Sequence, residues 1–272
     1  MSFSCLMYHK LSGVPGRRNY SDQYSIDTSA FREHVSLLQD EGYVIEDIAT
    51  FTKRIIESRS IPERYVLLTF DDGHKSGLDA AEILSVFRTK ATFFLTKSYC
   101  EQLPDYLSPE EIRSLRTEGF SIGTHGVTHC GLPFLSYKEI RRELAESKHW
   151  LEEILGEEVT MISVPGGYID DRTLALCFEH GYQIVGNSEE QMNSRSNISL
   201  PLVINRVAVR RHFSLNTIWS IVTGGTFFYF WRRVRAKSLW LPKRVLHTYK
   251  KTELVCRPKS MGEDGPHGGS TR

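Results

Sequence analysis

Two aspartates, Asp71 and Asp72, stand side by side directly after the apolar run YVLLTF at 65–70. The run is short and rich in β-formers, which predicts a buried strand. In parallel α/β folds, the side chains that do chemistry gather where such strands end. One aspartate would be enough to cap the following helix, and two adjacent carboxylates repel each other unless a cation lies beside them. The pair therefore indicates a cation site more strongly than a helix cap.

Two histidines follow another expected strand, in the stretch FSIGTHGVTHCG at 120–131. His125 and His129 are four positions apart, so both imidazoles can reach one ion from a helix or from a turn that curls back. One aspartate and two histidines leave coordination positions open, which is typical of a catalytic rather than a structural metal. A histidine pair alone is weak evidence, but two strand ends with complementary ligands support each other.

A third strand end carries ISVPGGYIDD at 162–171. Its proline and two glycines bring the backbone close to whatever occupies the site, and N–H groups there can face a developing oxyanion. Taken alone, the stretch would be better explained as an ordinary strand-to-helix turn with an aspartate cap.

Strand-like and helix-like segments alternate over the first 210 residues, which predicts repeated βα units around a parallel sheet. The expected strands are 3–8, 65–70, 91–95, 120–124, 160–164, 183–186 and 202–209. Helices are expected at 29–41, after the capping boxes SPEE at 108–111 and SYKE at 136–139, and from Asp170 or Asp171 to Gly181. About seven strands favour closure into a barrel, although the pattern also fits an open sheet.

The chain has 272 residues, enough for one large α/β domain or one domain with an appendage. Its formal net charge is +1, so no specific nucleic-acid partner is expected. The five cysteines include no C-x-x-C pair, which indicates reduced thiols rather than a disulfide framework or a cysteine zinc site. The first residues lack the pattern of a signal peptide, and we therefore expect a cytoplasmic protein.

Five stretches resemble the polysaccharide deacetylase family, also called the NodB-homology or carbohydrate esterase 4 group. They are TFDDG at 69–73, THGVTH at 124–129, VPGG at 164–167, LMYHKL at 6–11 and KATFFLT at 90–96. The resemblance spans about residues 3–210. It implies a distorted (β/α) barrel, usually of seven strands, and metal-dependent removal of acetyl groups from N-acetylated sugars, most often N-acetylglucosamine units.

The resemblance also implies roles for individual residues. Asp71 would be the general base, and Asp72, His125 and His129 would hold a divalent metal, commonly zinc. The two adjacent acids would then have different roles, because Asp71 would accept a proton and Asp72 would bind the ion.

Other residues are expected to line the substrate site. A backbone N–H at Gly166 would help to stabilise the oxyanion, and Tyr168 would lie next to it. His9, in the YH segment near the N-terminus, is expected at the rim of the site.

Two residues that the family often carries are missing. The place of an arginine that orients the base is Ser163, and Arg206, on the last expected strand, could replace it electrostatically or form a merely structural ion pair. The family's Leu-x-His general acid has no clear copy. His74, His212 and His247 are candidates, and each is more simply explained as a surface residue.

Residues 1–212 are expected to form the catalytic barrel, 213–255 a basic helical appendage, and 256–272 a disordered tail. Between residues 205 and 259 there are thirteen Lys and Arg and one acid, Glu253. Aromatic and basic residues together suit peripheral contact with an anionic membrane at its inner face. They also suit an anionic glycan or nucleic acid, or simple packing on the barrel. The apolar stretch at 218–231 is too short to span a bilayer.

The leading interpretation is a metal-dependent N-deacetylase of a GlcNAc-type polysaccharide, oligosaccharide or lipid-linked sugar. A barrel that only binds glycan would explain the missing arginine and histidine, but it would not need both acids. A hydrolase of another non-peptide C–N bond, such as a cyclic imide, would use the same metal-activated water. An iron oxygenase with two histidines and one carboxylate would need neither the extra base nor the βα pattern.

Overall fold

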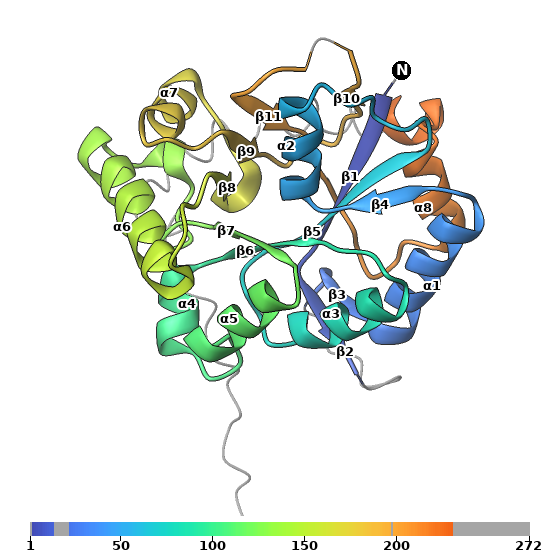
Figure 1. Ribbon diagram of the computed structural model, residues 1–272, viewed down its shortest axis with the longest axis horizontal. Helices are drawn as coiled ribbons and strands as arrows, with labels where there is room; N and C mark the ends of the chain where they lie inside the picture. The colour runs from blue at the N-terminus through green and yellow to red at the C-terminus, as the bar shows by residue number, and fades with distance from the viewer. Residues whose placement is uncertain (1, 14–21, 197, 231–272) are drawn as a thin grey trace, which may run out of the picture.

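The structure is a computed structural model that describes residues 2–13, 22–196 and 198–230 (Figure 1). The strands are β1 (Ser2–Tyr8), β2 (Lys10–Ser12), β3 (Ser25–Asp27), β4 (Val44–Glu46), β5 (Tyr65–Phe70), β6 (Thr92–Leu95), β7 (Ser121–Thr124), β8 (Met161–Ser163), β9 (Ile184–Gly186), β10 (Asn193–Ser194), β11 (Leu202–Ile204) and β12 (Val207–Ala208). The helices are α1 (Thr28–Asp40), α2 (Ile48–Ile56), α3 (Gly77–Val86), α4 (Lys97–Gln102), α5 (Pro109–Thr117), α6 (Tyr137–Leu155), α7 (Asp171–Glu179) and α8 (Leu215–Val222), with 3-10 turns η1 (Leu132–Phe134) and η2 (Pro165–Gly167).

Ten of the strands pair into one sheet in the order β10-β1-β5-β6-β7-β8-β9-β11, with β12 beside β1 and β4 beside β5. All of these pairings are parallel except that between β1 and β10. The end of the sheet turns back on its beginning, because β11 pairs with β9 while β12 pairs with β1. The short segment 202–208 therefore nearly closes the sheet into a barrel.

Alternation along the strands separates an inner cluster from the outer ones. Inward residues such as Phe3, Leu67, Phe94 and Ile204 share one buried cluster. Helix α2 adds Ile48 and Phe51 to that cluster, so it closes the end of the barrel at which the strands begin. Polar side chains lie at the opposite end of the barrel, at the carboxyl ends of the strands.

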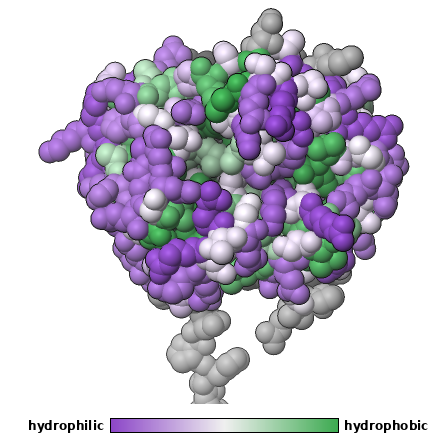
Figure 2. Space-filling view, viewed as in Figure 1, coloured by the Kyte–Doolittle hydropathy of each residue, from purple (hydrophilic) through white to green (hydrophobic). Residues whose placement is uncertain are grey.

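The remaining helices surround the sheet (Figure 1). Helices α1, α3, α5 and α8 pack on one outer cluster, and α6 and α7 pack with β8 and β9 on another. On the face viewed in Figure 2, hydrophobic residues show only as separate patches between hydrophilic ones. The apolar surface of the strands is thus covered mainly by helices.

The predicted barrel is confirmed, and the seven expected strands are present. The last one is split into β11 and β12, because the chain passes there from one edge of the sheet to the other. Both predicted capping boxes are formed, at Ser108 with Glu111 and at Ser136 with Glu139. The sequence missed β2, β3, β4 and β10, whose two or three residues are too few to show a period.

The described part of the expected appendage packs on the barrel. Phe213, Ile218 and Ile221 are buried in the same outer cluster as helix α1. Residues 231–255 and the expected tail at 256–272, including the proposed membrane contact and His247, lie outside the described residues. Among the residues that are described, no helix has both the length and the apolar character needed to cross a bilayer.

Most of the described cysteines match the expected redox state. Cys5, Cys100 and Cys177 carry free thiols. Cys130 is disulfide-bonded, so the expectation of reduced thiols is wrong at this position.

Candidate active site

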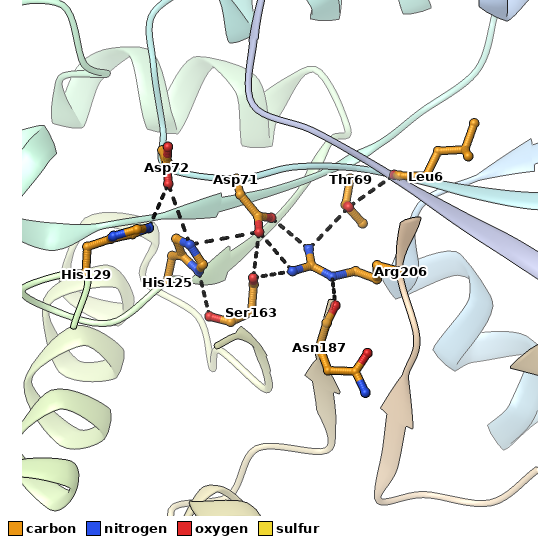
Figure 3. A network of polar contacts seen from close by, with 9 residues as sticks. All are labelled: Leu6, Thr69, Asp71, Asp72, His125, His129, Ser163, Asn187 and Arg206. Atoms are coloured by element: carbon orange, nitrogen blue, oxygen red, sulfur yellow. Dashed lines mark hydrogen bonds and ion pairs between the residues drawn. The ribbon is translucent and has the colours of Figure 1, made fainter. Parts of the chain in front are cut away.

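The polar cluster at the carboxyl ends of the strands consists mostly of inward-facing residues (Figure 3). On β5, Tyr65 and Leu67 belong to the inner cluster, and the period of two places Thr69 and Asp71 on the same face. The same alternation directs Ser163 inward after Met161 on β8, and Arg206 inward after Ile204. The cluster therefore forms one polar layer above the apolar filling of the barrel.

Asp71 is held by an arginine and a serine. Arg206 donates from Nη1 to Asp71 Oδ1 at 2.7 Å and from Nη2 to Asp71 Oδ2 at 2.8 Å. Ser163 Oγ donates to Asp71 Oδ2 at 2.8 Å and accepts from Arg206 Nη2 at 2.6 Å. Burial is the largest influence on the pKa of Asp71 and would raise it, but the charge and hydrogen bonds of Arg206, together with the charges of His125 and His9, hold that pKa below its ordinary value. Asp71 is thus an ionised carboxylate at neutral pH.

Arg206 itself is fixed from the opposite side. Its Nε donates to the Asn187 carbonyl oxygen at 3.0 Å, and its Nη1 lies 3.3 Å from Thr69 Oγ1. Gly186 leaves room for the side chain, since a Cβ at that position would lie 2.9 Å from Arg206 Nε. The sequence analysis considered Arg206 as a possible electrostatic substitute for the arginine that is missing at Ser163. In the structure, the guanidinium of Arg206 contacts the carboxylate of Asp71.

Asp72 leaves the alternation of the strand and faces the two histidines. Its φ of 77° lies in the left-handed region, which aspartate tolerates better than most residues. Asp72 Oδ1 lies 3.1 Å from His129 Nε2 and 3.6 Å from His125 Nε2. One ligand atom from each of the three residues can be chosen so that all lie within 4.8 Å of one another. The donor set of one carboxylate and two imidazoles fits a divalent transition metal.

His125 is oriented by a backbone carbonyl. Its Nδ1 lies 2.7 Å from the Ser163 carbonyl oxygen, which can only accept, so Nδ1 carries the proton and Nε2 faces Asp72. Burial lowers the pKa of His125 to about 4, although Asp71 acts in the opposite direction. The ring is therefore neutral at neutral pH, with the lone pair of Nε2 available to an ion.

The turn from His125 to His129 is supported by residues that the sequence analysis missed. Tyr99 on α4 stacks on the His129 ring, with centroids 5.5 Å apart and planes 26° apart. Glu143 on α6 accepts hydrogen bonds from the backbone of Val127 and Thr128. Glu143 could have been suspected, because it is an acidic residue within the apolar stripe of a helix.

The other expected site residues show weaker connections. The charge of His9 contributes to lowering the pKa of Asp71, and its ring packs on Tyr24 with centroids 4.7 Å apart. Gly166 adopts φ 69° in the turn after β8, and Tyr168 is half exposed and packs on Phe134. The structure therefore brings His9 into the electrostatic neighbourhood of Asp71 and leaves Gly166 and Tyr168 on the adjacent loop.

The candidate general acids have other contacts. His74 Nδ1 lies 2.9 Å from Ser76 Oγ, and the His74 ring contacts Tyr106 edge-on. His212 is exposed and packs edge-on against Phe213.

Known proteins share part of this sequence and this fold. Residues 58–185 match the family model described as polysaccharide deacetylase. The fold is similar to the solved structure of Streptococcus pyogenes deacetylase PplD in complex with acetate, with a TM-score of 0.73, 22% identity, and coverage of 82% of this chain and 98% of that one. The matched region, residues 58–185, belongs to the polysaccharide deacetylase family, the NodB-homology or carbohydrate esterase 4 group.

Two curated relatives extend the comparison. YxkH of Bacillus subtilis (strain 168), provisionally named a polysaccharide deacetylase, is 29% identical over 192 residues, which are 70% of this chain and 66% of that protein. A peptidoglycan-N-acetylglucosamine deacetylase of Bacillus cereus is 28% identical over 125 residues, which are 45% of this chain and 56% of that protein. The matches thus span two thirds or less of the length of these relatives.

Proposed function

We propose that this protein is a metal-dependent hydrolase that removes N-acetyl groups from an N-acetylated saccharide. The observation that carries the proposal is the pairing of two arrangements in one buried layer. One ligand atom each from Asp72, His125 and His129 converges on a common point, and Asp71 stands beside them as a carboxylate held by Arg206.

The metal ligands would be Asp72, His125 and His129, and zinc suits two imidazoles and one carboxylate best. A divalent ion bound there would supply an activated water at neutral pH and polarise the acetamide carbonyl. The neutral His125, with its proton on Nδ1, supports this assignment, because the free lone pair faces Asp72.

Asp71 would accept the proton of the attacking water as general base. Its Oδ2 lies 3.9 Å from His125 Nε2, so this oxygen faces the ligand side of the cluster. The bonds from Arg206 and Ser163 hold the carboxylate in one orientation. Orientation and ionisation at neutral pH are the two properties that a general base needs.

The substrate would lie over the open end of the barrel. We assign the oxyanion contact to the backbone of Gly166, and the rim to His9 and Tyr168. A glycan with N-acetylglucosamine units is the substrate class that the name of the Bacillus cereus relative supports. The alternative of a barrel that binds glycan without catalysis is less well supported, since it would need neither the ionised Asp71 nor its arginine.

The proposal is tested by measuring acetate release from N-acetylglucosamine oligomers. Wild-type protein reconstituted with Zn²⁺ is compared with metal-free protein and with Asp71→Asn, which keeps the shape of the side chain. We expect release only from the zinc-loaded wild type, with kcat of Asp71→Asn lower by about 10²–10⁴-fold.

The outcomes separate the alternatives. A fully active Asp71→Asn variant would show that Asp71 is not the base. No release from protein that binds zinc would favour another amide substrate. No release and no zinc binding would favour a glycan-binding barrel.

A further inference from the structure

Glu143 is a buried acid in the middle of an apolar helix face. Helix α6 turns Ile140, Leu144 and Leu151 toward the core, and Glu143 lies in the same stripe with 3% of its surface exposed. A buried carboxylate is costly unless hydrogen bonds replace its water. The residues that donate hydrogen bonds to Glu143 therefore indicate its structural role.

Within the described part of the chain, the hydrogen bonds of the Glu143 carboxylate go to the turn between the two histidines. Oε2 accepts from Val127 N at 2.7 Å and from Thr128 N at 3.0 Å, and Oε1 accepts from Thr128 Oγ1 at 2.6 Å. Gly126 permits the approach, since a Cβ there would lie 3.0 Å from Glu143 Oε2.

The same turn is held from its other side by α4. The backbone N–H groups of Lys97 and Ser98 donate to the carbonyl oxygens of Gly126 and Val127 at 3.1 and 2.9 Å. The turn is thus clamped, with its N–H groups on α6 and its carbonyl groups on α4. In this clamp α6 contributes the carboxylate of Glu143, and α4 contributes backbone N–H groups.

The clamp holds a conformation that the turn would not favour alone. His129 has φ 60°, a left-handed value that is sparsely populated by residues with a side chain. Such conformations persist where the surrounding structure over-determines them. In this conformation of the turn, His129 Nε2 lies 3.1 Å from Asp72 Oδ1.

We propose that Glu143 is a positioning residue for the metal centre, which fixes the turn from His125 to His129 and thereby sets the affinity for a divalent ion. The inference rests on the proposed function for the assignment of the ligands. Residues that orient metal ligands typically change metal affinity by about 10–100-fold when they are removed.

The variant Glu143→Gln can distinguish the charge of Glu143 from its hydrogen-bond geometry. In Glu143→Gln, the amide oxygen can accept from Val127 N and Thr128 N, while the amide nitrogen donates to Thr128 Oγ1. The variant loses the charge and keeps the geometry. Glu143→Ala loses both and leaves the buried N–H of Val127 and the part-buried N–H of Thr128 without this acceptor.

The test measures the Kd for Zn²⁺ by competition with a chromogenic chelator, with folding checked by circular dichroism and thermal unfolding of the metal-free protein. We expect Glu143→Ala to bind zinc about 10–100-fold more weakly, and Glu143→Gln to bind it close to the wild type. Glu146→Ala, an exposed acid on the same helix, should match the wild type. If Glu143→Ala does not fold, Glu143→Asp carries the same expectation of loss, because its shorter side chain cannot span the three donors.

Wild-type affinity in a folded Glu143→Ala or Glu143→Asp variant would overturn the inference. So would Glu143→Gln binding as weakly as Glu143→Ala, since the effect would then come from charge and not from geometry. Wild-type protein that binds zinc but releases no acetate would refute the proposed reaction and leave the role of Glu143 standing. Wild-type protein that binds no zinc would refute both.

Discussion

Arg206 and Asp71 are 135 residues apart in the sequence and form a two-pronged ion pair, with Nη1–Oδ1 at 2.7 Å and Nη2–Oδ2 at 2.8 Å. Both side chains are buried. Removing two charges from water costs several kcal/mol per ion, and their attraction offsets this only with good geometry and further hydrogen bonds. Ser163 and Asn187 provide such bonds here. Arg206 lies between β11 and β12, and Asp71 follows β5, so the ion pair links the last strands of the sheet to β5.

Removing the arginine should affect both stability and chemistry. In Arg206→Met, Asp71 becomes a buried carboxylate without its counter-ion, and we expect a loss of about 3–5 kcal/mol in the free energy of unfolding. The pKa of Asp71 should rise, because the charge that lowers it is gone. The acid limb of kcat/KM against pH should therefore move to higher pH. Urea unfolding and a pH profile measure the two effects.

Two control variants sharpen this prediction. Arg141→Ala removes an exposed pair with Glu179 and should cost less than about 1 kcal/mol. The double variant Arg206→Met with Asp71→Asn removes both charges and should be more stable than Arg206→Met alone. A double variant as unstable as Arg206→Met would show that Arg206 acts through packing and not through Asp71.

Substitution of the two adjacent aspartates should have different effects on the zinc content of the protein. Asp72→Asn and His129→Ala each remove one of the three converging ligands, and we expect both to lose bound zinc under conditions that load the wild type. Asp71→Asn should keep its zinc, because Asp71 contacts Arg206 and Ser163. Elemental analysis after dialysis measures the content. Equal loss of zinc from both asparagine variants would contradict the division of roles.

A methyl group added at Gly186 on β9 should disturb Asp71 indirectly, by displacing Arg206. In Gly186→Ala, the new Cβ would lie 2.9 Å from Arg206 Nε, so the guanidinium must move from Asp71. We expect a marked fall in kcat while zinc affinity stays close to the wild type. Gly13→Ala is the control, since a Cβ at Gly13 has no neighbour within 4 Å among the described residues. Unchanged kcat in Gly186→Ala would show that the position of Arg206 is not critical.

The stability of the metal-free protein should fall as the solution becomes more acidic. Burial lowers the pKa of His34 from 6.5 to about 4, so the unfolded chain binds a proton in this range that the folded chain does not. The stability that neutral His34 contributes is therefore complete above about pH 6.5 and is lost as the pH falls toward 4. His125 acts in the same direction.

The variant His34→Gln isolates this contribution. Glutamine can keep a hydrogen bond to Tyr8 Oη, which lies 3.2 Å from His34 Nδ1, but it does not titrate. We expect the slope of unfolding free energy against pH to decrease by about one proton between pH 4 and 6.5. Urea titrations at several pH values measure it. An unchanged slope would mean that His34 is protonated alike in both states.

Much of the site could be anticipated because its evidence is local. Asp71 and Asp72 are neighbours at the end of one strand, and His125 and His129 occupy a single turn. The strands themselves show as apolar runs, and the helix starts at Ser108 and Ser136 show as capping boxes. Each of these features depends on residues within a few positions of one another, which is the range over which period and capping act.

The partners of these residues were decided only by the tertiary structure. Whether Arg206 meets Asp71 depends on which edge of the sheet the last strand joins, and the chain there pairs with β9 and then with β1. The bonds of Ser163 to Asp71 and of Glu143 to the histidine turn join segments 92 and 15–16 residues apart. The sequence determined a barrel with two acids and two histidines at its strand ends. Barrel closure and helix packing decided which charge holds which acid, because a buried carboxylate takes its partners from whatever the fold brings within hydrogen-bonding distance.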